Sequence, residues 1–207
     1  MIYYPIEKLL SAGIKEILIV TGVEHMGDVV NLLGSGKDFG CNFTYKVQDT
    51  AGGIAQAMSL AENFAKNCPT VTILGDNIFQ DDLSAHFQKF ARQKTGARVL
   101  LKEVAWPQRF GVAEISNGKV IGIEEKPKKP KSNLAVTGIY FYDHTVFDII
   151  KTLKPSRRGE LEVTDINNHY IKKDQLQCDI LDGWWTDAGT FESLACANEL
   201  VNKEPPK

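Results

Sequence analysis

The sequence predicts an α/β fold with a mostly parallel central sheet and helices on both of its faces. Short apolar, β-branched runs such as 16–21 and 70–74 are typical of strands that are buried on both faces. Segments with apolar residues at helical spacing lie between these runs, and glycines separate many of the segments. Strands that alternate with helices favour a parallel sheet, because each helix carries the chain back to start the next strand in the same direction.

The first half of the chain carries most of this alternation. Ile2, Ile6, Leu9 and Leu10 share one face of an opening helix, which Gly13 ends. We expect strands at 16–21, 42–47, 70–74 and 98–104, with helices up to residue 33, at 54–64 and at 83–93.

The second half changes in style. The pair Asn117-Gly118 predicts a β-hairpin that joins strands 111–115 and 119–124. A basic, proline-punctuated loop follows at 126–131. We expect strands at 135–142 and 176–181, helices at 145–152, 163–172 and 191–201, and a frayed tail at 204–207.

The chain begins with a helix, although an α/β sheet normally begins with a strand whose following loop holds the phosphates of a ligand. No GxGxxG or GxxxxGK[ST] motif occurs. Either the fold starts here or the first βα unit is absent from this chain. If the unit is absent, we expect the strands beside it to have unpaired backbone groups. The chain could then repack, or it could pair these groups with a strand from a second copy.

The composition is that of an ordinary globular protein and excludes several classes. Hydrophobic residues make up 43% of the 207 residues, and the net charge of −2 gives no electrostatic case for binding nucleic acid or an anionic membrane. Cys41, Cys68, Cys178 and Cys196 are widely spaced, which argues against a zinc site or a disulfide framework. Reduced cysteines, and the lack of a signal peptide or a spanning segment, favour a cytoplasmic protein.

Two aspartates form the first candidate site. Asp76 directly follows the run 70–74, and a carboxylate at the carboxyl end of a parallel strand faces the crevice where ligands bind. Asp187 precedes a helix that Thr190 can cap. Each also has an ordinary interpretation, as a turn cap for Asp76 and as part of a plain turn for Asp187. Together they suit a divalent cation in nucleotidyl transfer.

Glu124, Glu125 and Lys126 form the second candidate. Neighbouring residues of a strand point to opposite faces, so one carboxylate can accept hydrogen bonds from sugar hydroxyls while Lys126 meets a phosphate. The alternative is a solvated run of charges.

Two further segments carry candidate residues. Gln48 ends a strand before a glycine turn, and its amide has the donor and acceptor that suit the edge of a base, while Gly53 lets the backbone approach a ligand. Arg158, in the segment 154–165, can bind a phosphate or pair with Glu160. A plain β-to-α turn and a basic loop before a helix are the alternatives.

Motifs spread over nearly the whole chain occur in an order that points to one family. They are MIYYP (1–5), LGDNIF (74–79), RFGV (109–112), EEKP (124–127), PKSN (130–133), VTGIYFYD (136–143) and RGELEVT (158–164). Together they resemble the glucose-1-phosphate thymidylyltransferases, a family of sugar nucleotidyltransferases. PKSN with the following VTG is the most specific part, whereas GDN alone is shared by many sugar nucleotidyltransferases.

The resemblance implies a fold and a domain organisation. The fold is a three-layer, Rossmann-like sandwich of the nucleotide-diphospho-sugar transferase type, with a mixed, mostly parallel sheet and without its first βα unit. A single domain covers 1–207, and its hairpin and loop at 105–135 form part of the sugar-binding side.

The resemblance also implies roles for residues. Asp76 and Asp187 would hold Mg²⁺, and Lys126 and Arg158 would act in catalysis by meeting the sugar phosphate. The implied substrate-binding residues are Gln48 and Gly53 for the thymine, with Gly111, Glu125, Val136 and Gly138 on the sugar side.

The implied reaction transfers a thymidylyl group from dTTP to glucose 1-phosphate, which gives dTDP-glucose and pyrophosphate for deoxysugar and cell-surface polysaccharide biosynthesis. Homo-oligomers are common in the family. Gly52 stands where familiar members often carry an acidic residue, a difference that concerns the choice of base. The family's glycine-rich loop, which holds the triphosphate, precedes the point that matches Met1. The chain is therefore expected to turn over poorly. A UTP-using uridylyltransferase and a truncated, non-catalytic remnant that binds nucleotide-sugar are the alternatives.

Overall fold

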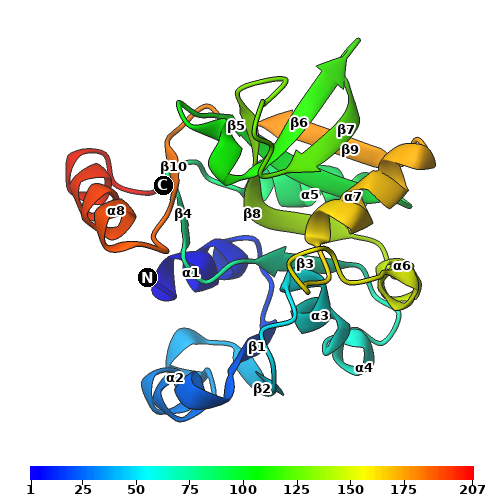
Figure 1. Ribbon diagram of the computed structural model, residues 1–207. Helices are drawn as coiled ribbons and strands as arrows, with labels where there is room; N and C mark the ends of the chain where they lie inside the picture. Colours follow the sequence, from blue (N-terminus) through cyan, green and yellow to red (C-terminus); the bar gives the residue numbers. More distant parts are fainter.

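The computed structural model describes residues 1–207, and it contains helices on both faces of a mixed sheet (Figure 1). The helices are α1 (Tyr3–Ser11), α2 (Met26–Leu33), α3 (Ile54–Ser59), α4 (Glu62–Ala65), α5 (Ser84–Arg92), α6 (Val146–Thr152), α7 (Val163–Lys172) and α8 (Phe191–Lys203). The strands are β1 (Glu16–Gly22), β2 (Asn42–Gln48), β3 (Thr70–Ile73), β4 (Asn77–Phe79), β5 (Ala97–Glu103), β6 (Gly111–Ser116), β7 (Lys119–Glu125), β8 (Leu134–Tyr142), β9 (Leu176–Ile180) and β10 (Trp185–Asp187).

The long strand β8 is the centre of the main sheet. It runs antiparallel to β5 along much of its length, to β3 at one end and to β6 at the other. β9 pairs in parallel with β5, and β7 completes the predicted hairpin with β6. The main sheet is mixed, as expected, but it is mostly antiparallel and not mostly parallel, since β5–β9 is its one parallel pair. β1 and β2 also pair in parallel, but they form a separate two-stranded sheet. The alternation of strands and helices did not reveal this, because it does not fix the direction in which β8 lies between β3 and β5.

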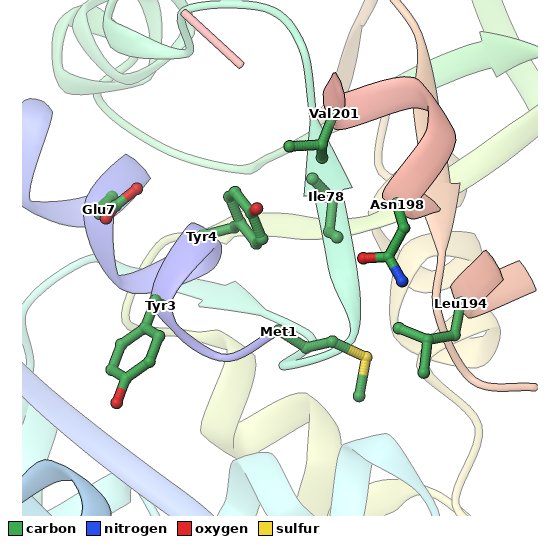
Figure 2. Close-up of a pocket in the computed structure, with 8 residues that line it drawn as sticks. All are labelled: Met1, Tyr3, Tyr4, Glu7, Ile78, Leu194, Asn198 and Val201. Carbon is green, nitrogen blue, oxygen red and sulfur yellow. The ribbon is translucent and has the colours of Figure 1, made fainter. Parts of the chain in front are cut away.

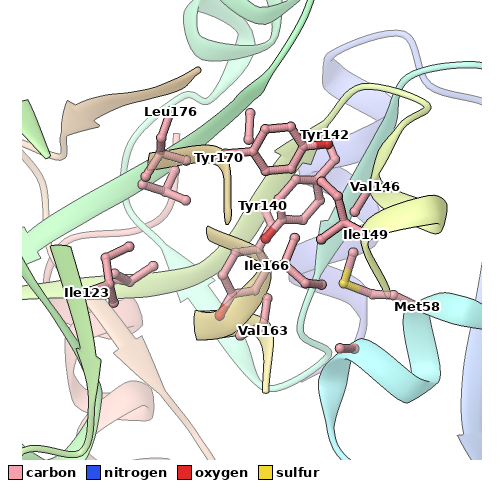
Figure 3. Packing of buried hydrophobic residues seen from close by; sticks show 14 of the residues in the cluster. Met58, Ile123, Tyr140, Tyr142, Val146, Ile149, Val163, Ile166, Tyr170 and Leu176 are labelled. Atoms are coloured by element: carbon pink, nitrogen blue, oxygen red, sulfur yellow. The ribbon is translucent and has the colours of Figure 1, made fainter. Parts of the chain in front are cut away.

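The two faces of β8 build the two halves of the main core. Tyr140 and Tyr142 point into a cluster with helices α3, α6 and α7, which Figure 3 shows from close by. Ile139 and Phe141 point to the opposite side, where they pack with Phe87 and other residues around α5. This alternation follows from the two-residue period of a strand. It confirms the predicted three-layer arrangement.

The first strands form a separate unit. β1 pairs only with β2, and Ile17 and Ile19 pack with Ile6 of α1 and Leu33 of α2 in a small core of their own. Figure 1 shows α2, β1 and β2 at one end of the molecule and the β6–β7 hairpin at the other. β3 pairs only with β8, so β1 and β3 each have one edge that pairs with no strand.

Other expectations need correction. The helix expected at 54–64 is divided into α3 and α4, and β4 and β10 form a short antiparallel pair where turns were expected. The tail is not frayed, because the Lys207 N–H donates to the Gln80 carbonyl at 2.8 Å and the Trp184 indole donates to the Glu204 carbonyl at 2.9 Å. Hydrogen bonds between residues so far apart in the sequence cannot be predicted from a local sequence pattern. No helix combines the length and the apolar character that crossing a membrane needs.

Candidate active site

Asp76 and Asp187 are brought together by the pairing of β4 with β10. Asn77 lies opposite Asp187 in this pair, and the Ala188 N–H donates to the backbone carbonyl of Asp76 at 2.8 Å. A β-carbon built on Gly189 would lie 3.1 Å from Oδ2 of Asp76 and 4.0 Å from Oδ2 of Asp187. Both carboxylates therefore converge on the same side of residue 189, although more than a hundred residues separate them in sequence.

The pair fits a small, hard divalent cation. Both side chains are only partly buried, and each has a carboxylate oxygen directed to the shared space beside Gly189. No group of three or more His, Cys, Asp or Glu side chains with metal-binding geometry occurs. Mg²⁺ is commonly held by one or two carboxylates, with substrate phosphates and water as the other ligands. Two aspartates are thus a sufficient protein contribution.

Arg109 is a cation beside this pair that the sequence analysis did not single out. Its guanidinium Nη2 lies 3.6 Å from Oδ2 of Asp187. Arg109 ends the short helical turn Pro107–Arg109, directly before Phe110, whose ring packs on Trp185 at 5.1 Å. Its presence in the RFGV motif was the only available signal, because its partner is far away in the sequence.

Glu125 and Gly111 form the centre of the second part of the site. They lie opposite each other in the β6–β7 hairpin, and a β-carbon on Gly111 would come within 3.3 Å of Oε2 of Glu125. The nearly buried hydroxyl of Thr164 donates to the same oxygen at 2.6 Å. Glu124, the preceding residue, is exposed, which agrees with the predicted alternation along the strand.

Arg158 is shared among three carboxylates. It pairs with Glu160, and its guanidinium lies 3.7 Å from Glu125 and 3.5 Å from Glu162. The hydrogen bond with Glu160 raises the pKa of Arg158, and the nearby charges of Glu162, Glu160 and Glu125 act in the same direction. Pairing with Glu160, one of the two alternatives that the sequence left open, is therefore present.

The glycine turn around Gly53 packs against the segment that carries Arg158. The Leu161 N–H donates to the Gly52 carbonyl at 2.7 Å, and a β-carbon on Gly53 would lie only 2.5 Å from the Leu161 carbonyl oxygen. Gly53 also has a φ of +95°, so both the conformation and the space require glycine. Two segments that the sequence analysis treated separately thus form one structural unit.

Gln48 lies beside this turn with its amide orientation fixed. Its Nε2 donates to the Gly53 carbonyl at 3.2 Å and to Oε1 of Gln56 at 2.8 Å. A carbonyl can only accept, so Nε2 must face it and Oε1 of Gln48 is left as a free acceptor. Gln56 also accepts a hydrogen bond from the Gly52 N–H at 3.0 Å, a role that the sequence analysis missed.

Three other candidate residues have clear positions. Lys126 is exposed at the end of the hairpin, has a φ of +43°, and donates its N–H to the Phe110 carbonyl at 3.0 Å. Left-handed φ values are uncommon in residues other than glycine and gather at functional sites. Val136 is buried in the main core, so its side chain contributes mostly to packing. Gly138 contacts Asn77 beside Asp76 and thus lies next to the carboxylate pair.

The pKa of Tyr140 responds to both acidic parts of the site. Burial raises the pKa of its hydroxyl, and the negative charges of Glu125 and Asp76 raise it further. Both carboxylates therefore lie within electrostatic range of the same phenol. Residues 109–111 provide a second connection, since Arg109 approaches Asp187 while Gly111 lies opposite Glu125.

A separate cavity between α1 and α8 does not suit the same ligands. It has a volume of about 360 Å³, within the range of small-molecule sites. Figure 2 shows that Tyr3, Tyr4, Ile78 and Val201 help to line it, with Glu7 as its charged residue. Its one charged side chain is acidic and does not favour a phosphate, so the candidate site remains the one around Asp76, Asp187 and Glu125.

Comparison with known proteins decides the family. A family model described as nucleotidyl transferase matches residues 1–204. The chain belongs to the nucleotidyl transferase family. Members similar to it include the glucose-1-phosphate thymidylyltransferase of Neisseria meningitidis serogroup A, which is 45% identical over 205 residues that cover 97% of this chain and 71% of the relative. The nucleotidyltransferase Agl11 of low-salt glycan biosynthesis in Haloferax volcanii is 38% identical to this chain. The matched region covers 96% of this chain and 56% of Agl11.

Solved structures of similar proteins share this fold. A crystal structure assigned to a glucose-1-phosphate thymidylyltransferase from Bacillus anthracis, in complex with a sucrose, is 60% identical with a TM-score of 0.93 and covers 97% of this chain and 81% of that chain. A UDP-glucose pyrophosphorylase in complex with UDP-glucose is 25% identical with a TM-score of 0.82, and covers 97% and 85% of the two chains. The predicted nucleotide-diphospho-sugar transferase fold is confirmed.

Proposed function

We propose that this nucleotidyl transferase transfers a thymidylyl group from dTTP to glucose 1-phosphate, giving dTDP-glucose and pyrophosphate. The observation that supports it most is that one continuous segment lies beside both the Asp76–Asp187 pair and Glu125. Residues 109–111 contact Asp187 at one end and lie opposite Glu125 at the other. The names of the 45% and 60% identical relatives point to the same substrates.

The reaction asks the protein for alignment and charge neutralisation. A phosphate oxygen of glucose 1-phosphate attacks the α-phosphorus of dTTP, the bond to pyrophosphate breaks, and no covalent intermediate with the protein is needed. Asp76 and Asp187 would hold Mg²⁺, which supplies positive charge to the phosphates when it is bound. A fixed geometry of the reacting groups then lowers the barrier.

The glucose 1-phosphate is assigned to the charged group of Glu125, Lys126 and Arg158. Glu125 is placed to accept hydrogen bonds from sugar hydroxyls, and Arg158 and Lys126 bring positive charge for the phosphate. Arg158 is held by three carboxylates, so a bound phosphate would replace some of these partners. The hairpin within 105–135 supplies Gly111 and Glu125 and is therefore proposed as part of the sugar side.

The base is assigned to the turn around Gly53. The free Oε1 of Gln48 can accept a hydrogen bond from the N3–H group of a pyrimidine. Thymine and uracil both carry that group, so this contact does not separate dTTP from UTP. UTP is for that reason the second candidate, and the fold of UDP-glucose pyrophosphorylase is compatible with it.

Titration calorimetry with Mg²⁺ tests the proposal and separates the two nucleotides. We expect dTDP-glucose to bind about 10-fold more tightly than UDP-glucose, because a thymine methyl group that packs against protein contributes about 1–3 kcal/mol. 2′-Deoxy-UDP-glucose, which lacks only this methyl group, separates its effect from that of the 2′-hydroxyl. Pyrophosphate release from dTTP is expected to be slow, and it should depend on added glucose 1-phosphate. Tighter binding of UDP-glucose would favour the uridylyltransferase, and the binding of neither compound would overturn both assignments.

The proposal also includes the state and place of the protein, namely a homo-oligomer in the cytoplasm. The wide spacing of the cysteines supports a reducing compartment, and the thiols of Cys41, Cys68, Cys178 and Cys196 are all free. Sedimentation equilibrium of the purified chain measures the oligomeric state, and a monomer at all concentrations would contradict it.

A further inference from the structure

Asn77 is the residue that connects the Asp76 carboxylate to the buried part of the fold. Asn77 is only 2% exposed and lies on β4, which pairs with β10, and its side chain also reaches β8. Oδ1 accepts hydrogen bonds from the Gly138 N–H at 3.0 Å and from the Trp185 indole N–H at 2.7 Å. Nδ2 donates to Oδ1 of Asp76 at 2.7 Å. Three of the four hydrogen-bonding positions of this amide are thus occupied by named partners.

The orientation of this amide is determined by its partners. A backbone N–H and an indole N–H can only donate, so the oxygen of Asn77 must face Gly138 and Trp185. Nδ2 is then necessarily directed to Asp76. The space around the amide is also closed, since a β-carbon on Gly138 would lie 2.5 Å from Oδ1 of Asn77. A flipped or rotated amide would leave buried donors without partners, which costs about 1–3 kcal/mol for each group.

The fixed amide of Asn77 makes the two carboxylate oxygens of Asp76 different from each other. Oδ1 is occupied by Asn77, whereas Oδ2 is the oxygen that approaches the space beside Gly189, where Oδ2 of Asp187 also lies. The hydrogen bond therefore selects which oxygen of Asp76 is presented to that space. It also fixes the rotation of the carboxylate, since Asp76 itself is only partly buried and lies between β3 and β4.

We propose that Asn77 is a positioning residue for divalent-cation binding: its amide, locked by Trp185 and Gly138, holds the Asp76 carboxylate with Oδ2 directed toward Asp187. This inference rests on the metal assignment in the proposed function. Partners that orient a metal ligand typically contribute 10–100-fold to metal affinity. The same connection ties the cation site to β8, the central strand of the main sheet.

Mn²⁺ alone is the probe, and its binding is followed by the electron paramagnetic resonance signal of free Mn²⁺ in the full chain. Asn77→Ala is expected to weaken Mn²⁺ binding about 10–100-fold. Trp185→Phe leaves Asn77 in place but removes one of the two donors that lock it, and a loss of about 3–10-fold is expected. The thermal unfolding midpoint of each variant, measured without metal, separates weak binding from loss of the fold.

Trp184→Phe is the matched control. Trp184 is the adjacent tryptophan, and its indole N–H donates to the Glu204 carbonyl, away from Asn77. It should bind Mn²⁺ like the unchanged protein.

The outcomes separate this inference from the proposed function. If the unchanged chain binds no Mn²⁺, the metal assignment fails and the inference fails with it. If the unchanged chain binds Mn²⁺, and folded Asn77→Ala and Trp185→Phe bind it equally well, only the positioning role is overturned. Should Asn77→Ala not fold, Trp185→Phe compared with Trp184→Phe decides the question. An equal loss in both tryptophan variants would also contradict the specific role of Asn77.

Discussion

The carboxylate pair Asp76–Asp187 and the charged group around Arg158 are held by different kinds of structure. Asp187 ends β10, and Asp76 directly precedes β4, whose residues are all buried. Arg158 lies between α6 and α7 outside any helix or strand, and its side chain is 39% exposed. The strand pair fixes the positions of the two carboxylates, whereas the loop group balances the charge of Arg158 with nearby carboxylates.

The difference indicates how the two parts work. A cation site gains from fixed ligands, because oxygens that are already placed do not reorganise when the ligand arrives. A phosphate-binding arginine that is paired with carboxylates can exchange one partner for another while its charge stays balanced. The comparison predicts that substitutions in the strand pair abolish activity, while substitutions in the loop mainly weaken sugar-phosphate binding.

Removal of either aspartate should have the largest effect. Asp76→Ala and Asp187→Ala each take away one of two protein ligands, and we expect kcat to fall at least about 10²–10³-fold. The measurement is Mg²⁺-dependent pyrophosphate release from dTTP and glucose 1-phosphate. Asp182→Ala is the control, since this aspartate is exposed and lies outside the β4–β10 pair. Near-normal kcat in either site variant would contradict the two-carboxylate assignment.

Arg158→Ala should have an intermediate effect on binding. The loss of charge-assisted hydrogen bonds to a phosphate corresponds to about 1.5–3 kcal/mol, so the KM for glucose 1-phosphate should rise about 10–100-fold. The KM for dTTP should change much less. Arg157→Ala is a matched control, because this neighbouring arginine is exposed and makes no ion pair. Equal effects in both arginine variants would show that only the general charge of the loop matters.

The charge cluster around Asp179 lies outside both regions, and its substitution should have the smallest effect, on stability alone. Burial raises the pKa of Asp179, but hydrogen bonds from Lys89 and His86 and the charge of Arg98 outweigh it and hold the pKa at about 2. The folded-state pKa is thus depressed, so the stabilisation is complete above about pH 4 and is lost as the pH falls toward 2.

Asp179→Asn should therefore lower the free energy of unfolding at pH 7 by about 1 kcal/mol. The difference from the unchanged protein should shrink between pH 4 and pH 2, as followed by urea unfolding. Activity at pH 7 should stay the same, in contrast to the aspartates of the β4–β10 pair. A difference that did not depend on pH would show that the ion pairs of Asp179 are not its cause.

The main elements of the fold could be predicted because their signals are local. The apolar runs at 16–21 and 70–74, the Asn117-Gly118 turn and the helical spacing of 163–172 each appear near their expected place. β4 and β10 were not predicted, since a three-residue strand has too few residues to show a period. The antiparallel direction of β8 between β3 and β5 could not be predicted either, because a local sequence pattern does not indicate which strands pair.

The candidate site was predicted in its residue types more than in its connections. Asp76, Glu125 and Arg158 were found through motifs, and Asn77, Thr164 and Glu162 lie in the same motifs, but only the contacts show that these residues are their partners. Thr164, for example, is 39 residues from Glu125 in the sequence and donates to it at 2.6 Å. No spacing rule relates two such positions.

The sequence by itself determined the family, the alternating elements and the kinds of side chain that serve the site, because each depends on residue identity or on short-range periodicity. Only the tertiary structure decided which oxygen of Asp76 is free, which carboxylates share Arg158, and how the glycine turn rests on residues 160–161. These features depend on the pairing of β4 with β10 and on the packing of separate loops. Such long-range contacts form only when the whole core is assembled, so no local segment can specify them alone.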